Sequence, residues 1–578
     1  MKFTNTLLPF RRDFIIPDMI AGLIVAIMLV PQAVAYAFLA GLPPQAGLFA
    51  SLLPLLAYAA LGTSPTLAVG PVAIISLMTL SSLTGVVAPD NSDYPAYAAL
   101  LAGMTATWLF IFFIAGLGSW TSFISHSVIS GFTSAAAIVI IISQLKYFTA
   151  LDIPRGGAGW EPLVFTAEHW KDADSLPFII GLLGIALLIF WQRIVPRVTY
   201  RLPIHSTLGT LLNRAGPLVL ISSGIVMTLM FNMDLRTVGA VPTGLPDFSI
   251  PDVMNLNWQA LLLPSAILAL IIFLESLSIA NTMGREQHVR VKPNQEILAL
   301  GAANAAAAIT QAMPVAGGFG RSMVMISAGA RSQLASVFTF GFMAFVCLVA
   351  GSWFEHLPVA ALGVIIVVAT WPLFRWQDGW NAWKFQRGDG LVWLITFAGV
   401  LAMDAESGII AGVTLSLIIY LRRTSQPHIA EIGRIHNTEL FRNVLRHKTE
   451  RVPDVMLIRV DENLYFANSD YLVDYVLNRI NQQEESISHV VLVGSAINHI
   501  DYSGLEALEL LHENLAEQNI QLHLAEFKGP VMDQLENTHL LEKIAPGRSF
   551  FTIPDALQAL SPEYSKPPED GSDDFYTI

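Results

Sequence analysis

Two charged residues lie inside long apolar stretches, where ionised side chains are rare. Glu275 lies in LLLPSAILALIIFLESLSIANTM and Arg321 in GGFGRSMVMISAGARS. A charge at the centre of a bilayer costs about 2.5–3.5 kcal/mol on the insertion scale, so each residue needs a compensating role. One interpretation is a structural salt bridge between the two. The other is a site in which Arg321 receives an anion, while Glu275 takes up a proton or balances the arginine. An apolar environment favours the protonated carboxyl group, which suits proton coupling.

Two irregular segments, 66–86 and 313–332, begin with Gly/Pro-rich sequence and then become helix-like. If their helices begin near mid-membrane, at Gly70–Val72 and Gly320–Ser322, both N-terminal ends point at one spot. Free N–H groups and the positive ends of helix dipoles bind anions there. Ser322 adds a hydroxyl donor, and a nearby fixed arginine favours a dianion over a halide. The alternative is that both segments are kinked packing helices.

In VPQAVAYAF, Gln32 and Tyr36 are spaced i and i+4 and therefore share one helical face, after a potential kink at Pro31. These polar side chains would hydrogen-bond a substrate, or they would join packed helices to one another. The sequence offers little other chemistry. Its one cysteine, Cys347, lies in an apolar run, which excludes a disulfide framework and a cysteine-based metal site. The spans show no nucleophile–base pair and no metal-ligand cluster, so neither an enzyme nor a cofactor or metal is predicted.

The elements that carry these residues are membrane spans. The chain has 578 residues, of which 53% are hydrophobic and only 13% charged, too few charges for a soluble protein. Residues 1–420 hold 19 Lys/Arg and 20 Asp/Glu, whereas 421–578 hold 13 and 25. The first part is therefore a nearly neutral membrane domain, and the second is an acidic soluble domain. Its acidity argues against nucleic acid as a partner.

Fourteen stretches have the length and composition of membrane crossings if the two irregular segments are included. They are 18–38, 46–62, 66–86, 97–118, 125–145, 176–192, 215–232, 260–280, 294–310, 313–332, 333–352, 357–375, 390–403 and 408–422. With fourteen crossings, every Lys/Arg-rich loop falls on one side, which is the cytoplasmic side, and both termini lie there too. Seven spans precede residue 240 and seven follow in the opposite sense. The irregular spans are third in each inverted half, as expected of a transport site.

The soluble part predicts an α/β domain. Strands are expected at Val455–Val460, Leu464–Phe466, His489–Val493 and Gln521–Ala525, with helices at Ser469–Ile480 and Leu505–Ala516. The expected domains are a transmembrane domain over 1–422, a linker over 423–450, the α/β domain over 451–560 and a disordered tail over 561–578.

The sequence resembles the SulP family of anion transporters, of the sulfate permease type. The resemblance rests on VPQAVAYAFLAGLPPQAGLFASLLP, TLAVGPVA, ISHSVISGFTSAAAIVI, VGAVPTGLP, NQEILALGAAN and GARSQLAS. The fragments AINHIDYSGLEALELL and IQLHLAEFKGPVMDQLE resemble the STAS domain that ends such proteins. The resemblance implies a homodimer with core and gate domains that moves its anion by an elevator-like shift. It places the substrate between the third and tenth spans.

The positions that match the family's substrate site are Gln32, Tyr36, the backbone of Gly70, Val72 and Ala73, Glu275, Gly320 and Arg321. Sulfate-transporting members commonly read Ser-Arg where this chain reads Gly320-Arg321. The lost hydroxyl puts oxyanion selectivity in question, although Ser322 is a candidate replacement. In the STAS-like part, Ser503 matches a position that is phosphorylated in anti-sigma-antagonist relatives. Its alternative role is a helix N-cap.

The sequence thus predicts a secondary importer of sulfate in the inner (plasma) membrane, driven by protons through Glu275. Alternatives on the same scaffold are a sodium-coupled bicarbonate transporter and a dicarboxylate importer. A halide channel agrees less well with a buried Arg–Glu pair. From a different class, a membrane sensor would signal through Ser503.

Overall fold

The structure is a computed structural model of the chain. It describes residues 12–118, 125–153, 158–201, 209, 212–213, 215–231, 235–239, 244–251, 256–349, 355–436, 438–483 and 486–564. The chain divides into two compact units, Met1–Ser416 and Leu417–Ile578. Each unit has its own hydrophobic core.

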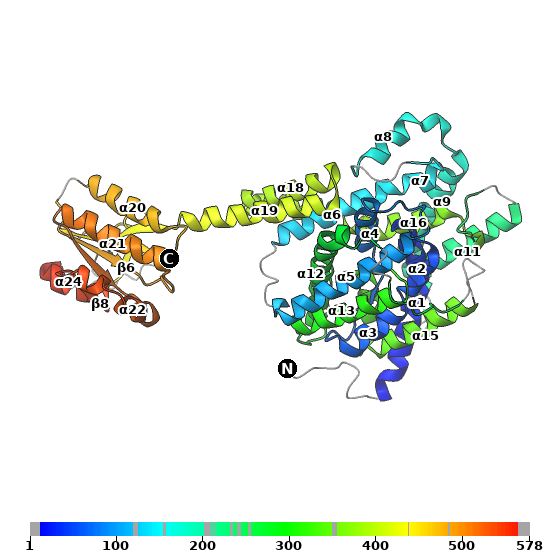
Figure 1. Cartoon of the computed structure of the whole chain (residues 1–578), viewed down its shortest axis with the longest axis horizontal. Helices are drawn as coiled ribbons and strands as arrows, with labels where there is room; N and C mark the ends of the chain where they lie inside the picture. Colours follow the sequence, from blue (N-terminus) through cyan, green and yellow to red (C-terminus); the bar gives the residue numbers. More distant parts are fainter. Residues whose placement is uncertain are drawn as a thin grey trace. The chain divides into compact units, whose positions relative to one another are not determined.

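The first unit is a bundle of apolar helices (Figure 1). They are α1 (Ile15–Leu39), α2 (Pro44–Phe49), α3 (Leu53–Leu61), α4 (Ala73–Thr84), α5 (Tyr94–Ile114), α6 (His126–Ser143), α7 (Leu145–Thr149), α8 (Glu161–Glu168), α9 (Ser175–Arg201), α11 (Gly216–Phe231), α12 (Leu262–Glu286), α13 (Pro293–Ile309), α14 (Phe319–Ser327), α15 (Leu334–Val349), α16 (Val359–Thr370), α17 (Trp376–Phe385), α18 (Arg387–Ala402) and α19 (Ala405–Ser425), the last of which continues into the second unit. Most are apolar all round, as expected for helices that lie in lipid or in a bundle core.

Each of the fourteen predicted spans contains a helix. In the described part of the chain, eight helical segments are long and apolar enough to cross a membrane, and α4, α11 and α15 are shorter apolar helices. Helix α4 is short because its span begins with extended chain. The structure confirms a polytopic helical domain, and the number fourteen stays a prediction.

Helix α1 runs unbroken through Pro31 and packs against α2, α14, α15 and α16. Its contact with α2 depends on Gly47. A Cβ atom there would lie 1.9 Å from the carbonyl oxygen of Ala33, so only glycine permits this approach. The contact holds the part of α1 that carries Gln32 and Tyr36.

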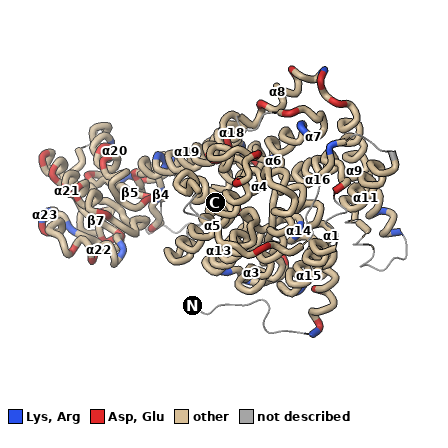
Figure 2. The backbone as a smooth tube through the Cα atoms, turned by 45° about the vertical axis from the view of Figure 1, so that its right-hand side comes forward, with Lys and Arg blue, Asp and Glu red and all other residues tan. Residues whose placement is uncertain are grey.

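The distribution of charge differs between the two units, as predicted. Figure 2 shows long stretches of the helical unit without charged residues, whereas α20, α21 and α23 of the second unit carry acidic residues. A bundle with so few charges is suited to an apolar solvent.

The second unit contains a six-stranded mixed sheet in the order β4-β3-β5-β6-β7-β8. The strands are β3 (Ile429–Arg434), β4 (Phe441–Asn443), β5 (Val455–Val460), β6 (His489–Val493), β7 (Gln521–Ala525) and β8 (Ser549–Phe550). Strands β5 to β8 are parallel, and β3 is antiparallel to both of its neighbours. The helices are α20 (Ser469–Asn481), α21 (Tyr502–Glu517), α22 (Gly529–Glu536), α23 (Leu540–Lys543) and α24 (Ile553–Leu560).

Two local expectations in this unit are wrong. Leu464–Phe466 is not a strand, because only Leu464 forms a bridge, to Ile500. Ser503 is not the N-cap of its helix. The N-cap of α21 is Asp501, whose side chain accepts a hydrogen bond from Gly504 N at 2.8 Å. Ser503 is the second residue of the helix and is half-buried.

The segment 423–450, expected as a linker, contributes β3 and β4 to the sheet, so the soluble unit begins before residue 451. Charged residues interrupt the apolar pattern of β3 and hide the strand in the sequence. One of them, Glu431, is only 6% exposed and forms ion pairs with Arg451 at 2.7 Å and Arg479 at 2.6 Å. At the other end, Pro562–Tyr564 form a short 3-10 helix, and residues 565–578 of the predicted disordered tail lie outside the described residues.

Candidate anion-binding site

The two irregular segments meet in the buried interior of the helical unit. Strand β1 (Val69–Gly70) pairs antiparallel with β2 (Ala316–Gly317), so that Val69 faces Gly317 and Gly70 faces Ala316. Each strand leads into a short helix, α4 at Ala73 and α14 at Phe319. The N-terminal ends of two helices, from opposite halves of the chain, are therefore brought to one place. We call this arrangement the strand crossing.

Hydroxyl groups fasten the strand crossing. Ser322 Oγ accepts a hydrogen bond from Ala68 N at 3.0 Å and donates one to Gly318 O at 2.8 Å. Ser276, on α12, accepts from Gly317 N at 2.9 Å. The hydroxyl proton of Ser322 is thus directed at a backbone carbonyl. The expectation that Ser322 donates to a substrate does not agree with this geometry, which gives Ser322 a positioning role.

Two side-chain amides hold the extended chain on either side of the crossing. Asn304 forms hydrogen bonds of 3.0 Å with both N and O of Val315. Gln333 Nε2 donates to Ser64 O at 2.7 Å and to Leu67 O at 3.0 Å. Both amides are fully buried. They satisfy backbone groups that an interrupted helix leaves without intrahelical partners.

Arg321 lies in the first turn of α14 and is only 3% exposed. Its Nη1 donates to Pro71 O at 2.7 Å, while Nε and Nη2 are buried without a hydrogen-bond partner. The guanidinium therefore lies at the N-terminal ends of both α4 and α14. Three positive groups converge here, and two donors are unsatisfied, which is the environment that an anion with several oxygens stabilises.

Glu275, on α12, interacts electrostatically with Arg321 and with Tyr36. Its Oε2 is buried without a hydrogen-bond partner. No nitrogen of Arg321 donates to Glu275, since Nη1 donates to Pro71 and the other two have no partner. The interpretation of a closed salt bridge therefore does not describe this structure. The carboxyl group acts on Arg321 through space.

Tyr36 is buried beside these charges, with 6% of its surface exposed. Gln32 lies one turn earlier on α1 and is half-buried. Val72 is the N-cap residue of α4 and Ala73 is its first residue, and both are buried. The structure thus brings Tyr36, Glu275 and Arg321 together at the strand crossing.

Glycines shape the space around the guanidinium. A Cβ atom at Gly70 would lie 3.4 Å from Arg321 Nη2, and one at Gly318 would lie 2.8 Å from it. Gly320, by contrast, is exposed, and a Cβ atom there would meet nothing within 4 Å. A serine side chain would therefore be accommodated at position 320 without rearrangement.

Replacing Gly318 with alanine is expected to weaken anion binding at Arg321, with an apparent KM for the anion at least about tenfold higher. The φ angle of Gly318 is −103°, so alanine is tolerated by the backbone, and the effect comes from the clash with the guanidinium. Gly341→Ala is the matched control, because a Cβ atom at Gly341, unlike one at Gly318, would meet nothing within 4 Å. Equal KM values for the two variants would show that the position of the guanidinium is unimportant.

Sequence reasoning missed two buried carboxylates that lie outside the site. Glu296, in the first turn of α13, is fully buried and accepts hydrogen bonds from Tyr58 Oη at 2.8 Å, Thr63 N at 2.7 Å, Ser64 N at 3.2 Å and Thr63 Oγ1. Asp18 is also fully buried. The signal in both cases is a carboxylate in the first turn of an apolar helix, which a helix-capping role also explains.

Asp18 accepts hydrogen bonds from Arg331 N at 2.7 Å and from Ser332 Oγ at 2.5 Å. This contact ties the start of α1 to the chain between α14 and α15. Like the Glu296 contacts, it joins the first half of the unit to the second.

A cavity of about 920 Å³ lies apart from the strand crossing. It is lined by parts of α4, α6, α12 and α19, and not by Tyr36, Glu275 or Arg321. At its wall, Ser82 donates to Glu406 at 2.7 Å. The site at Arg321 is thus defined by unsatisfied donors and charge rather than by the size of a cavity. The described residues contain no cluster of His, Cys, Asp and Glu that would hold a metal ion.

Comparisons with known proteins agree with this arrangement. The model of the sulfate permease family matches residues 15–396, and that of the STAS domain matches residues 446–556. The chain is 32% identical over 560 residues to probable sulfate transporter 4.2 of Arabidopsis thaliana, covering 94% of this chain and 80% of that protein. It is 30% identical to a probable sulfate transporter of Mycobacterium tuberculosis, covering 95% and 96%.

Solved structures share the fold. The murine solute carrier 26 family member A9 anion transporter, in its inward-facing state, superposes with a TM-score of 0.87 at 23% identity, covering 96% of this chain and 93% of that chain. The transmembrane domain of a cyanobacterium bicarbonate transporter superposes with a TM-score of 0.57 at 19% identity, covering 71% of this chain and 98% of that chain.

Proposed function

The chain belongs to the sulfate permease family, whose members are transporters, and from this premise we propose that it imports sulfate together with protons. The proposal is carried by the buried Nε and Nη2 of Arg321, which have no hydrogen-bond partner at the N-terminal ends of two helices. A guanidinium offers paired N–H groups to two oxygens of one anion. Each helix end adds the equivalent of about half a positive charge. Together they balance a dianion.

Glu275 provides the coupling in this proposal. When its carboxyl group is ionised, it repels an incoming dianion and neutralises part of the attraction from Arg321. When it is protonated, the positive charge of the site is available to sulfate. Sulfate and a proton therefore favour each other's binding, and this reciprocal effect is what a symporter requires.

The strand crossing supports an elevator-like movement. Its two strands come from different halves of the chain and are joined by β1–β2 pairing and by the hydrogen bond from Ala68 N to Ser322 Oγ. Opening the site by separating α4 from α14 would break these buried hydrogen bonds, and each such break costs about 1–3 kcal/mol. Moving both helices as one body leaves the hydrogen bonds intact. We propose that the site is carried across the membrane in this way.

The proposal also covers the membrane topology, the location and the regulation of the protein. The chain is a multi-pass membrane protein, and its Lys/Arg-rich loops support cytoplasmic termini. We propose that it acts in the inner membrane as a homodimer, as its family resemblance implies. In the STAS domain, phosphorylation of Ser503 would place a phosphate in the first turn of α21, where the helix dipole stabilises negative charge.

Uptake of radiolabelled sulfate into proteoliposomes tests the transport proposal. An inward proton gradient is expected to drive accumulation, and a protonophore is expected to abolish it. Absence of sulfate flux in tight, correctly loaded vesicles would contradict the proposal. Sodium-driven bicarbonate uptake would then be tested, followed by dicarboxylate uptake. Ligand binding without any flux would favour a sensor.

Replacing Glu275 with glutamine is expected to abolish stimulation of uptake by the proton gradient and to leave sulfate binding measurable. Glutamine keeps the size of the side chain and cannot take up the proton. The matched control is Glu286→Gln, which changes an exposed residue at the end of the same helix. Uptake rates measured at several proton gradients show how strongly each variant depends on the gradient. Unchanged gradient dependence in the Glu275 variant would remove this residue from the coupling.

A further inference from the structure

The acidic second unit contains a pocket with a basic lining. The pocket has a volume of about 310 Å³ and is lined by three arginines, two histidines, Asn443 and Asp461. We call it the basic pocket. Its arginines are Arg442 on β4, Arg446 in the following turn and Arg459 on β5. It lies at the β4 edge of the sheet, within one unit and far along the chain from the residues of the transport site.

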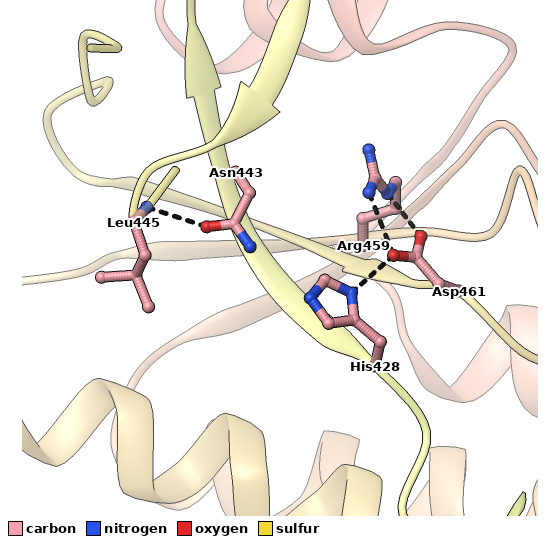
Figure 3. Close-up of polar contacts among 5 residues, drawn as sticks. All are labelled: His428, Asn443, Leu445, Arg459 and Asp461. Atoms are coloured by element: carbon pink, nitrogen blue, oxygen red, sulfur yellow. Dashed lines mark hydrogen bonds and ion pairs between the residues drawn. The ribbon is translucent and has the colours of Figure 1, made fainter. Parts of the chain in front are cut away.

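The single carboxylate of the basic pocket is already neutralised. Arg459 donates to Asp461 through Nε at 2.5 Å and through Nη2 at 3.0 Å, and His428 Nδ1 lies 2.7 Å from Asp461 Oδ2 (Figure 3). Burial opposes ionisation of Asp461, but these hydrogen bonds and the nearby positive charge outweigh it and lower the pKa of this carboxyl group. Arg442 and Arg446 therefore remain as surplus positive charge in the lining.

Hydrogen bonds within the turn after β4 fix the backbone on this side of the basic pocket. Asn443 Oδ1 accepts from Leu445 N at 2.8 Å, as Figure 3 shows, and the carbonyl of Asn443 accepts from the N–H groups of Arg446 and His447, both at 3.1 Å. The side chains of Arg442, Arg446 and His447 are exposed and reach this pocket. A fixed turn that carries cations beside a concave surface reduces the ordering cost of binding an anion.

Basic and acidic residues are distributed unevenly along the sequence of the second unit. Residues 422–459 hold eight Lys/Arg and four Asp/Glu, whereas 460–578 hold five and 21. Most of the unit therefore repels anions, and the basic pocket lies in the part that attracts them. The basic part also adjoins the membrane along the chain. His428 follows Ser425, the last residue of α19, by three residues, or about 10 Å of extended chain.

We propose that the basic pocket binds a phosphate group, presented by an anionic lipid headgroup or by a soluble anion. Paired N–H groups of arginine match phosphate oxygens. Basic segments just inside a membrane attract anionic lipids, which makes a headgroup one source. The pocket is distinct from the transport site, so this binding would regulate or anchor the STAS domain independently of which anion is transported.

The test uses the full chain in nanodiscs of phosphatidylcholine, titrated with inorganic phosphate by calorimetry. All measurements are made in the Arg321→Ala background, so that binding at the transport site does not contribute. The double variant Arg442→Ala/Arg446→Ala is expected to bind phosphate at least about tenfold more weakly than its parent. Arg548→Ala is the matched control, because this exposed arginine precedes β8 at the opposite edge of the sheet. Arg446→Glu is a second test that changes one exposed residue.

A second set of nanodiscs, containing phosphatidylglycerol, distinguishes the two sources. If the lipid headgroup is the occupant, phosphatidylglycerol lowers the apparent phosphate affinity of the parent and not that of the double variant. If a soluble anion is the occupant, the parent binds phosphate equally well in both discs. The proposal is overturned if no phosphate binding is detected, or if the parent, the double variant and Arg446→Glu bind equally.

Discussion

Replacing Arg321 with alanine is expected to raise the apparent KM for sulfate about a hundredfold or more, with little uptake at low sulfate. The variant removes the paired donors that meet the anion and leaves Glu275 without its electrostatic partner. In the proposed complex, Arg321 and sulfate form a buried, hydrogen-bonded charge pair. Truncating one member of such a pair costs about 2–5 kcal/mol, which corresponds to this range. Sulfate uptake into proteoliposomes measures the effect directly.

Two further variants show how Arg321 acts. Arg321→Lys keeps the charge and loses the planar pair of donors, so its KM is expected to lie between those of the parent and the alanine variant. Arg285→Ala removes an exposed arginine at the end of α12 and is expected to leave KM unchanged. A near-normal KM for Arg321→Ala, in protein that retains its thermal stability, would contradict the proposed site.

Replacing Glu296 with alanine is expected to lower the free energy of unfolding by about 4 kcal/mol or more. The change leaves the donors from Tyr58, Thr63 and Ser64 buried without their acceptor, and each unsatisfied group costs about 1–3 kcal/mol. Glu296→Gln is expected to fall between the parent and the alanine variant, because its amide oxygen still accepts while its NH₂ group faces other donors. Thermal unfolding of the purified full chain measures this.

Glu286→Ala provides the control, since it removes an exposed carboxylate from the same bundle. A Glu296→Ala variant with the thermal stability of the parent would show that the four hydrogen bonds contribute little. Reduced uptake with unchanged stability would instead assign Glu296 to transport.

The sequence predicted the centre of the candidate site because charge is costly in an apolar span. Glu275 and Arg321 are conspicuous for this reason, and the matched positions of the two irregular segments correctly predicted that the segments meet. Helix α4 starts at Ala73, one residue after the expected Gly70–Val72, and α14 starts at Phe319, one residue before the expected Gly320–Ser322. These features depend on local sequence alone.

Other features depend on partners that are distant in the chain. The sequence predicts that Ser322 donates to the substrate, but its Oγ donates to Gly318 O and accepts a hydrogen bond from Ala68 N, which lies 254 residues away. Strand β3 was expected as linker because the partners that neutralise Glu431 follow later in the sequence. In the sequence, Glu296 looks like an ordinary carboxylate in the first turn of a helix. Only the structure shows that Thr63 and Tyr58 donate hydrogen bonds to it. A local pattern does not reveal which distant group satisfies a polar atom.

The hydrogen bonds between the two halves of the helical unit have a consequence for biosynthesis. Thr63 and Tyr58 are made more than 230 residues before Glu296, and Asp18 precedes Ser332 by 314 residues. While the first seven predicted spans enter the membrane, these polar groups have none of their final partners. The carbonyl oxygens of Ser64 and Leu67 gain their hydrogen-bond donor only after Gln333 has been synthesised. The first half is therefore an incomplete folding unit, exposed to quality-control proteases until the second half is inserted, and a chain that is truncated between the halves is expected to be degraded rather than to accumulate.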